Sequence, residues 1–244
     1  MTSSSPYASR FQWSSLRSVT LALAFVAAAC KGEPKTSVST TTPADTPASA
    51  PATSTAAAPS LLAGPSATPV QSPDSFRVVI ETSKGLITIA VKRALSPRGA
   101  DRFHELVTSG YFNDVRFFRH VPGFIVQFGM HGDSAINAVW EKAALPDEPM
   151  GMSNVRGTVV FATSGPNTRS NQFFFNLGDN TGSLDPYGNF SPFGTVVEGM
   201  DVVDKLNGEY GEQPNQSRIS SSGNEYLQRQ FPALDYIKSA RVIP

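Results

Sequence analysis

Three polar side chains lie within the most aromatic stretches of this sequence, and their types and spacing could do chemistry. The run FFRHVPGFIVQFGM, residues 117–130, contains four phenylalanines but also carries Arg119 and Gln127. A second run, FATSGPNTRSNQFFFNL over 161–177, places Gln172 directly before three phenylalanines. Because an unpaired buried charge is very costly, Arg119 must reach water, be paired, or stand ready for a ligand. The third possibility makes these residues a candidate functional site.

The usual signals of other catalytic chemistries are missing from the sequence. HELVT at His104 begins like a zinc-protease helix, but no second histidine follows four residues later. His120 and His131 lack the cysteine or carboxylate spacing of a metal site. The sequence has no G-x-S-x-G nucleophile motif and no phosphate-binding loop. We therefore expect no metal, no cofactor and no covalent nucleophile.

Strand alternation sorts the candidate residues onto faces. In the run 172–177, Gln172 and Phe174 share one face, and the phenylalanines on either side of Phe174 lie on the other. Ile125 and Gln127 likewise share a face. A barrel core explains the inward phenylalanines, but it does not explain arginine and glutamine within the same aromatic strands.

Short strands and two helices must position these residues. The stretch FRVVIETSKGLITIAVKR predicts a hairpin with a tight connection at 82–85. One helix is predicted to begin at Pro97, with Ser96 as its cap, and to end at Gly110. A second helix is predicted over 200–206. Further strands are predicted at about 115–121, 124–129, 158–162, 172–177, 193–197 and 236–242. The pattern is mainly β and predicts a closed antiparallel barrel capped by two α-helices.

The first third of the chain has a different composition and predicts export followed by a tether. Residues 1–29 combine a basic start that has no acid with the apolar run LALAFVAAA, as a signal peptide does. Residues 30–75 are mostly Ser, Thr, Pro and Ala, with too little apolar surface to fold, and predict a disordered, extended spacer. The folded domain is expected over 76–244, which is long enough for one buried core.

Cys30 is the single cysteine, and it follows three alanines. The stretch AAAC resembles the lipobox of bacterial lipoproteins, in which the cysteine is acylated and becomes the mature N-terminus. Ordinary signal peptidase could cut the same bond and leave a free Cys30. We expect a bacterial, exported lipoprotein that is held on a membrane through Cys30 and faces the periplasm or the cell exterior.

Three blocks of the sequence resemble the signature blocks of the cyclophilins, the peptidyl-prolyl cis-trans isomerases. They are FFRHVPGFIVQFG, FATSGPNTRSNQFFF and FGTVVEGMDVVDKL, and the similarity runs over about 76–244. The resemblance implies an eight-stranded antiparallel barrel capped by two helices, which agrees with the strand count. It also implies an isomerase that rotates X-Pro bonds in unfolded or flexible exported polypeptides and so assists their folding. Nucleic acid is not an expected partner, because 20 Lys and Arg balance 20 Asp and Glu.

Carried over residue by residue, the resemblance assigns roles to particular side chains. Arg119 would stabilise the twisted amide, Gln127 would hold the arginine and the substrate, and Phe124 would complete the catalytic set. The other implied positions bind substrate: Ile125, Ala162, Thr163, Gln172, Phe174, Leu184 and Phe190. Rotation about an X-Pro bond breaks no covalent bond to carbon, so this chemistry needs no nucleophile, metal or cofactor.

Several positions depart from the family pattern. Ser183 stands where the family often has a tryptophan, whose indole N–H binds the inhibitor cyclosporin. The loop after it carries an extra Pro186 and Tyr187, and Phe190 replaces the usual histidine or tyrosine. Thr163 and Ser164 replace the commoner Asn-Ala pair. The pocket floor is therefore expected to survive, while its rim and its substrate preference differ.

Two other classes of function stay open at this point. The domain could be a non-catalytic binder of proline peptides, or a tethered structural module with a vestigial pocket. The presence of Arg119, Phe124, Gln127, Gln172 and Phe174 argues against both. We expect the domain to act as a monomer.

Overall fold

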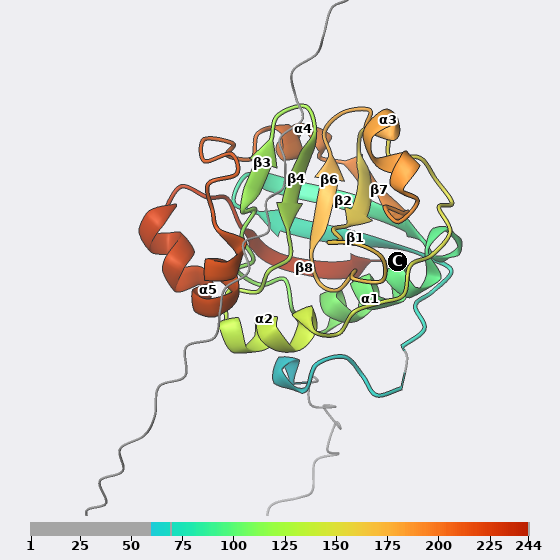
Figure 1. Cartoon of the computed structure of the whole chain (residues 1–244), viewed down its shortest axis with the longest axis horizontal. Coiled ribbons are helices and arrows are strands. Elements are labelled where there is room, and N and C mark those ends of the chain that lie inside the picture. Colours follow the sequence, from blue (N-terminus) through green and yellow to red (C-terminus); the bar gives the residue numbers. More distant parts are fainter. Residues whose placement is uncertain (1–59, 69, 244) are drawn as a thin grey trace, which may run out of the picture. The chain divides into compact units, whose positions relative to one another are not determined.

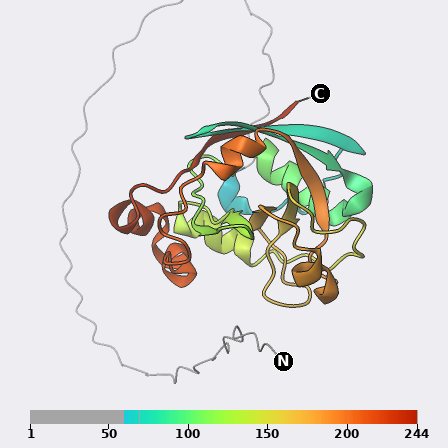
Figure 2. The same ribbon diagram turned by 90° about the horizontal axis from the view of Figure 1, so that it is seen from above.

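The computed structural model describes residues 60–68 and 70–243. The predicted signal peptide, Cys30 and residues 31–59 lie outside this part of the chain, so the predictions made for them are not addressed by the fold. Within the described residues, eight strands form one antiparallel sheet that curls into a half-barrel, with helices around it (Figures 1 and 2).

The strands are joined in the order β3-β4-β6-β5-β7-β2-β1-β8. Their bounds are β1 Ser75–Thr82, β2 Gly85–Lys92, β3 Arg119–Val121, β4 Ile125–Phe128, β5 Thr158–Phe161, β6 Phe173–Asn176, β7 Pro192–Glu198 and β8 Ile237–Ile243. The helices of the described part are α1 Pro97–Thr108, α2 Ser134–Glu141, α3 Thr181–Leu184, α4 Met200–Asp204 and α5 Gln216–Gln230. Three short 3₁₀ turns are η1 Leu61–Ala63, η2 Arg93–Leu95 and η3 Asp185–Tyr187.

The predicted hairpin and the eight-stranded, mainly β architecture are confirmed. β1 and β2 pair from Ser75↔Lys92 to Thr82↔Gly85, so only two residues form the turn. The predicted closed barrel is only a half-barrel, however. Its edge strands β3 and β8 do not pair with each other, and near them an isolated bridge joins Arg116 to Tyr236. β3 is only three residues long, too short to continue that bridge into a ladder.

Both predicted helices are present as α1 and α4, but the described residues contain three more. α2 begins at an N-cap, Asp133, whose carboxylate accepts hydrogen bonds from the Ala135 and Ile136 N–H groups. α5 begins similarly at Asn215 and is kinked at Gly223, where φ is 52°. That kink interrupts the helical period, so the sequence indicates only a short helical turn near the end of the chain.

The N-terminus of α1 is capped differently from the prediction. Ser96 occupies the N-cap position, but its hydroxyl makes no capping bond and donates instead to Glu148. The Glu148 carboxylate comes from the loop after α2 and accepts from the N–H groups of Arg98 (2.7 Å) and Gly99 (3.2 Å). A carboxylate at a helix N-terminus also interacts favourably with the helix dipole. A residue fifty positions away thus does what the local serine was expected to do.

Alternate residues of the strands fill the inside of the half-barrel. Val126 pairs with Phe175, which pairs with Val159, and these side chains are fully buried. Phe173 does the same between Phe128 and Phe161. The expected split of the 172–177 run is therefore confirmed, because Phe173 and Phe175 both face the core. Phe173 packs there with Phe103 of α1 and Phe193 of β7, and Phe175 stacks on Phe128.

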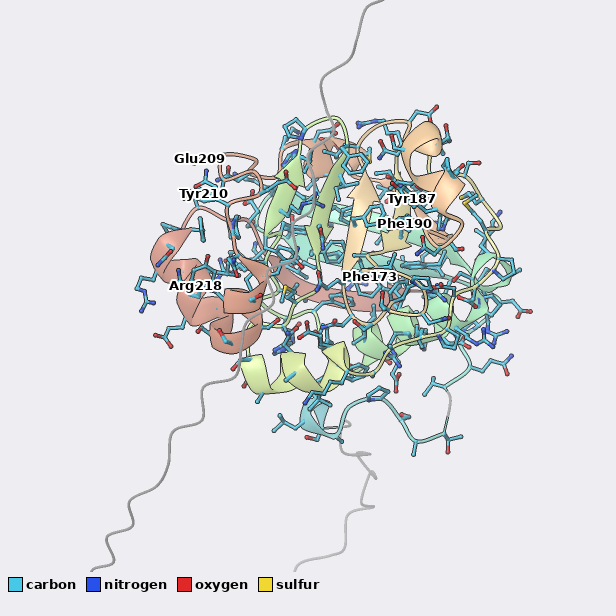
Figure 3. All side chains as sticks on the ribbon, in the orientation of Figure 1. Phe173, Tyr187, Phe190, Glu209, Tyr210 and Arg218 are labelled. Atoms are coloured by element: carbon cyan, nitrogen blue, oxygen red, sulfur yellow. The ribbon has the colours of Figure 1, made fainter. Side chains whose placement is uncertain are left out.

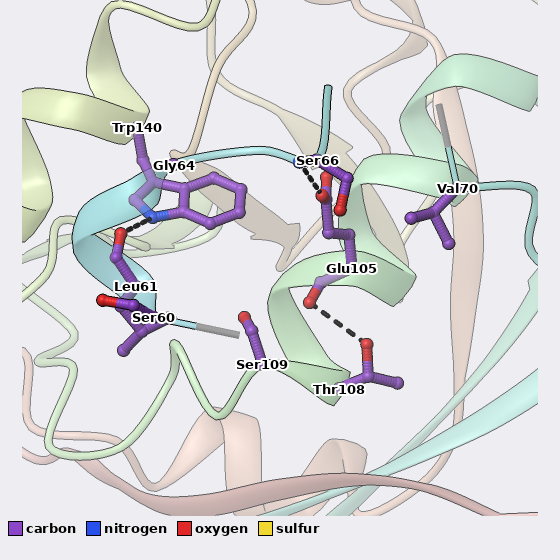
Figure 4. Close-up of a pocket in the computed structure, with 9 residues that line it drawn as sticks. All are labelled: Ser60, Leu61, Gly64, Ser66, Val70, Glu105, Thr108, Ser109 and Trp140. Carbon is purple, nitrogen blue, oxygen red and sulfur yellow. Dashed lines mark hydrogen bonds between the residues drawn. The ribbon is translucent and has the colours of Figure 1, made fainter. Parts of the chain in front are cut away.

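The predicted tether, residues 30–75, includes residues that the structure places against the folded domain. Residues 60–68 and 70–74 lie along α1 and α2 and are bonded to them (Figure 4). The indole N–H of Trp140 donates to the Leu61 carbonyl (2.9 Å), and the Ser66 N–H donates to Glu105 (2.6 Å). Leu61 also packs against the core, so this part of the segment buries apolar surface that its average composition conceals. We call the described residues 60–68 and 70–74 the strap. The strap and the two helices line a cavity of about 90 Å³, and none of the predicted site residues lines it.

Candidate active site

Four of the sheet's residues form a row across neighbouring strands on its outer face. Arg119 of β3 pairs with Gln127 of β4, Gln127 pairs with Phe174 of β6, and Phe174 pairs with Val160 of β5. Directly paired residues point to the same side of a sheet. The rows on either side of this one point into the core, so this row must point outward. The register thus brings the predicted arginine, glutamine and phenylalanine together.

A chain of hydrogen bonds links the polar members of the site. The Arg119 Nη1 donates to Gln127 Oε1 (3.1 Å), and Gln127 Nε2 donates to Gln172 Oε1 (2.8 Å). Gln127 is only 6% exposed, so its amide group forms hydrogen bonds with these two side chains instead of with water. The Arg119 side chain is 27% exposed. Arg119 is therefore both paired and reachable from solvent.

Glu212 is a partner of Arg119 that the sequence did not indicate. Its Oε1 accepts from Arg119 Nε (2.7 Å) and lies 2.5 Å from Nη2. The two residues are 93 positions apart, and Glu212 lies in a loop between α4 and α5 that carries no recognisable motif. Only the folded chain brings this carboxylate to the site.

An apolar cluster lies on the same outer face. Its buried members are Ile125, Val160, Phe174 and Leu184, and its partly buried members are Phe124, Ala162 and Phe190. Six of these seven are predicted site residues, and the structure brings them together. The seventh, Val160, was missed. The alternation of strand 158–161 could have found it, because Val159 and Phe161 point inward and leave Val160 facing outward.

Buried asparagines hold the elements that surround the apolar cluster. Asn180 Nδ2 donates to the Phe124 carbonyl (2.8 Å) and to Asn176 Oδ1 (2.6 Å). The Asn180 carbonyl accepts the N–H of Leu184 (2.8 Å), which places the Leu184 side chain in the cluster. Asn154 accepts from Asn176 (3.2 Å). Sequence reasoning missed these residues, although an asparagine that closes an aromatic strand, as Asn176 does, is a usable signal of a buried polar network.

Thr163 and Ala162, two of the predicted substrate-binding residues, already use polar groups in hydrogen bonds within the protein. The Thr163 hydroxyl lies 2.8 Å from the Thr168 hydroxyl and also bonds to the Gly165 carbonyl, so it stabilises its own loop. The Ala162 N–H donates to the Gln172 carbonyl (2.9 Å). A peptide that binds here must therefore use other atoms of these residues.

Aromatic side chains extend the site outward at α3 and η3. Phe190 packs edge to face with Phe174 (6.0 Å between ring centroids), and Tyr187 packs the same way on Phe190 (6.0 Å). Tyr187 is 73% exposed, and Figure 3 shows it next to Phe190 on the α3 side of the sheet. Ser183 is exposed on α3. Ser183 and Tyr187, two of the positions that depart from the family pattern, are thus both exposed to solvent.

The described residues offer little for other kinds of site. Among them, no three His, Cys, Asp or Glu side chains come together as metal ligands would. No helix of the described part is long and apolar enough to cross a membrane. The ring of His104 packs edge to face on Phe76 (5.1 Å), as a structural histidine does.

Comparison with known proteins agrees with this geometry. The family model described as "Cyclophilin type peptidyl-prolyl cis-trans isomerase/CLD" matches residues 77–224, which is more than half of the chain. The chain belongs to this family. Its enzyme class is therefore peptidyl-prolyl cis-trans isomerase, and the matched segment contains the whole row from Arg119 to Val160.

Relatives from distant organisms support the same assignment. Peptidyl-prolyl cis-trans isomerase A of Dickeya dadantii is 34% identical over 137 residues, which cover 54% of this chain and 71% of that protein. The human peptidyl-prolyl cis-trans isomerase-like 3 is 33% identical over 132 residues, covering 53% and 80%. A cyclophilin-type isomerase of Cryptosporidium parvum has the same fold: its crystal structure matches with a TM-score of 0.51 at 21% identity, over 70% of this cyclophilin and 98% of that chain.

Proposed function

We propose that this cyclophilin rotates X-Pro peptide bonds at the outer-face site, where Arg119 stabilises the twisted amide and the apolar cluster holds the proline ring. The observation that carries the proposal is the row in which Arg119, Gln127 and Phe174 stand side by side. It joins a charged donor to an apolar surface of the kind that a pyrrolidine ring needs. Gln127 and Gln172 support the guanidinium from the sheet side.

The transition-state stabilisation that X-Pro isomerisation requires is of the size that such a site can supply. Peptide-bond rotation is opposed by a barrier of about 18–20 kcal/mol because the nitrogen lone pair is delocalised. Uncatalysed X-Pro exchange takes tens to hundreds of seconds, so a turnover of about 10 s⁻¹ needs roughly 4 kcal/mol of transition-state stabilisation. When the amide twists, its nitrogen regains a lone pair and can accept a hydrogen bond. A charge-assisted bond from Arg119, formed mainly in the twisted state, supplies about 1.5–3 kcal/mol of this. Exclusion of water from the ring's binding surface supplies the rest.

The replacement Arg119→Ala tests this role. It removes the charged donor and is expected to lower kcat/KM for a proline peptide by roughly 30–150-fold, or about 2–3 kcal/mol, while the fold survives. Activity is measured in a protease-coupled assay on the soluble domain, and folding by thermal unfolding. Arg229→Ala is the matched control, because Arg229 is an exposed arginine of α5. Wild-type rates in Arg119→Ala would refute the proposed mechanism. A wild-type domain that binds proline peptides without turnover would make it a binding module.

The proposed cellular role is to assist the folding of exported polypeptides. It combines the isomerase class with the sequence of residues 1–30, which is typical of a bacterial lipoprotein. The substrates are unfolded or flexible chains that contain proline, and the enzyme acts as a monomer on the periplasmic or outer side of a membrane. A tether between Cys30 and the strap at residue 60 would let the site reach such chains.

Replacing Cys30 by serine tests the anchor. The variant is expected to leave the membrane fraction or to accumulate with its signal peptide uncut, whereas the wild type is membrane-bound. Mass spectrometry of the mature N-terminus identifies the modification and counts its acyl chains, because one chain anchors only marginally. An unmodified Cys30 on a soluble, processed protein would contradict the lipid anchor and leave export standing.

A further inference from the structure

Glu212 engages one edge of the Arg119 guanidinium. A guanidinium group has five N–H donors in a fixed plane. The Glu212 Oε1 takes the Nε donor and lies within bonding distance of Nη2, and Gln127 takes one donor of Nη1. Among the described residues, none accepts from the other two N–H groups, one on each terminal nitrogen. The guanidinium is therefore held from two sides and keeps a free end.

The loop that carries Glu212 is attached to the sheet beside Arg119. The N–H of His120, the next residue in β3, donates to the Gly211 carbonyl (3.0 Å). Gly211 has a φ of 52°, a left-handed conformation that glycine adopts without strain. The Tyr210 ring packs edge to face on Phe231 beyond α5 (5.2 Å). Figure 3 shows Tyr210 and its neighbour Glu209 on the α5 side of the sheet.

We propose that Glu212 is a positioning residue, which orients the guanidinium of Arg119 so that its two remaining N–H groups are presented to the substrate. The inference rests on the proposed role of Arg119. An arginine side chain has several rotatable bonds, and ordering them during each turnover would slow the reaction. Misplacement of a catalytic group by about 1 Å can cost two orders of magnitude in rate. Glu212 removes this freedom beforehand. Its side chain is 61% exposed, so it can be replaced without opening the core.

The test compares Glu212→Ala, Glu212→Gln and Glu209→Ala. Glu212→Ala is expected to lower kcat/KM for a short proline peptide by about tenfold, mainly through kcat, because the donor is misplaced rather than lost. Glu212→Gln keeps an acceptor of the same length and is expected to recover part of the rate. Glu209→Ala removes the same charge from the same loop and is expected to leave the rate unchanged. An unchanged or higher rate in Glu212→Ala would overturn the proposal, the higher rate meaning that the carboxylate competes with substrate.

Two further measurements separate positioning from a general structural effect. In the Arg119→Ala background, Glu212→Ala should cause no additional loss, because Glu212 acts only through Arg119; an additional loss would contradict the proposal. The ¹⁵N–¹H heteronuclear NOE of the Arg119 Nε–H should fall in Glu212→Ala and not in Glu209→Ala. This readout needs no activity: if the wild type failed to turn over proline peptides, the proposed function would fall, while the NOE would still decide whether Glu212 orders Arg119. An unchanged NOE would overturn the inference.

Discussion

Replacing Glu148 by glutamine is expected to lower the free energy of unfolding by about 3–5 kcal/mol, because it removes the carboxylate that is hydrogen-bonded to a buried arginine and also caps α1. Arg169 then keeps only the looser ion pair with Asp147, whose Oδ1 lies 3.8 Å from the Arg169 Nε and whose side chain is 25% exposed. The Arg169 side chain has no exposure, and its Nη2 lies 3.0 Å from Glu148 Oε2. The same carboxylate caps α1 through the Arg98 and Gly99 N–H groups and accepts from Ser96. Glutamine keeps the size of the side chain but carries no charge, and it offers a single acceptor oxygen. Chemical denaturation of both proteins measures the difference.

The same change is expected to reach the active site. The Leu145 N–H donates to the Arg169 carbonyl (2.7 Å), and Arg169 lies in the loop between Ala162 and Gln172. If Arg169 moves, the loop that joins Ala162 to Gln172 is expected to move with it. A loss of kcat/KM should therefore accompany the loss of stability.

The effect of Glu148 depends on pH in a defined direction. Burial alone would raise the pKa of the Glu148 carboxyl, but hydrogen bonds from Ser96, from the Arg98 N–H and from Arg169 outweigh burial and hold it below its usual range. A lowered folded-state pKa stabilises the fold above the unfolded value of about 4.3, and this contribution is lost as pH falls through the folded-state pKa. The stability gap between wild type and Glu148→Gln should thus stay constant at neutral pH and narrow in acid.

Two further variants provide controls. Asp201→Asn breaks the exposed ion pair between Asp201 of α4 and Lys205, which directly follows that helix, and is expected to leave stability unchanged. The double variant Glu148→Gln with Arg169→Met removes both charges and should be more stable than Glu148→Gln alone. A single variant as stable as the wild type would show that the ion pair and the cap do not hold this region.

Introducing tryptophan at Ser183 is expected to tighten cyclosporin binding by about 30–1000-fold, or about 2–4 kcal/mol. Serine cannot supply the indole N–H or its packing area, both of which the resemblance implies for the family's tryptophan. Ser183 is exposed on α3, directly before Leu184 of the apolar cluster, so an indole can be accommodated. Turnover of short proline peptides should change much less, because Arg119 and the cluster stay as they are. Titration of activity with cyclosporin measures the affinity.

A tryptophan placed elsewhere controls for non-specific apolar binding. Ser221→Trp, at an exposed position of α5, should leave cyclosporin affinity unchanged. Tight inhibition of the wild type, or no gain in Ser183→Trp, would show that Ser183 does not determine the affinity. Tyr187, which is 73% exposed beside Phe190, would then be the next residue to replace.

Patterns that depend on near neighbours in the chain were readable from the sequence. The alternation of β4 and β6 separated Phe173 and Phe175, which enter the core, from Gln127 and Phe174, which do not. A strand repeats every two residues whatever it packs against, so this division is local. The β1–β2 hairpin was predictable for the same reason, because two residues close it. The resemblance to the cyclophilins added which of the outward residues are expected to contact substrate.

Contacts that join distant segments were decided only by the tertiary structure. Glu212 reaches Arg119 across 93 residues, and Glu148 replaces Ser96 as the cap of α1 from a loop fifty residues away. Neither contact has a local signature, because a carboxylate in a polar loop looks the same in sequence whether it faces water or an arginine. The strap at Leu61 was hidden similarly, by the Pro- and Ala-rich composition around it. The sequence alone therefore indicated Arg119 and its apolar neighbours as a candidate site, whereas the contact between Glu212 and Arg119 depends on how the chain folds.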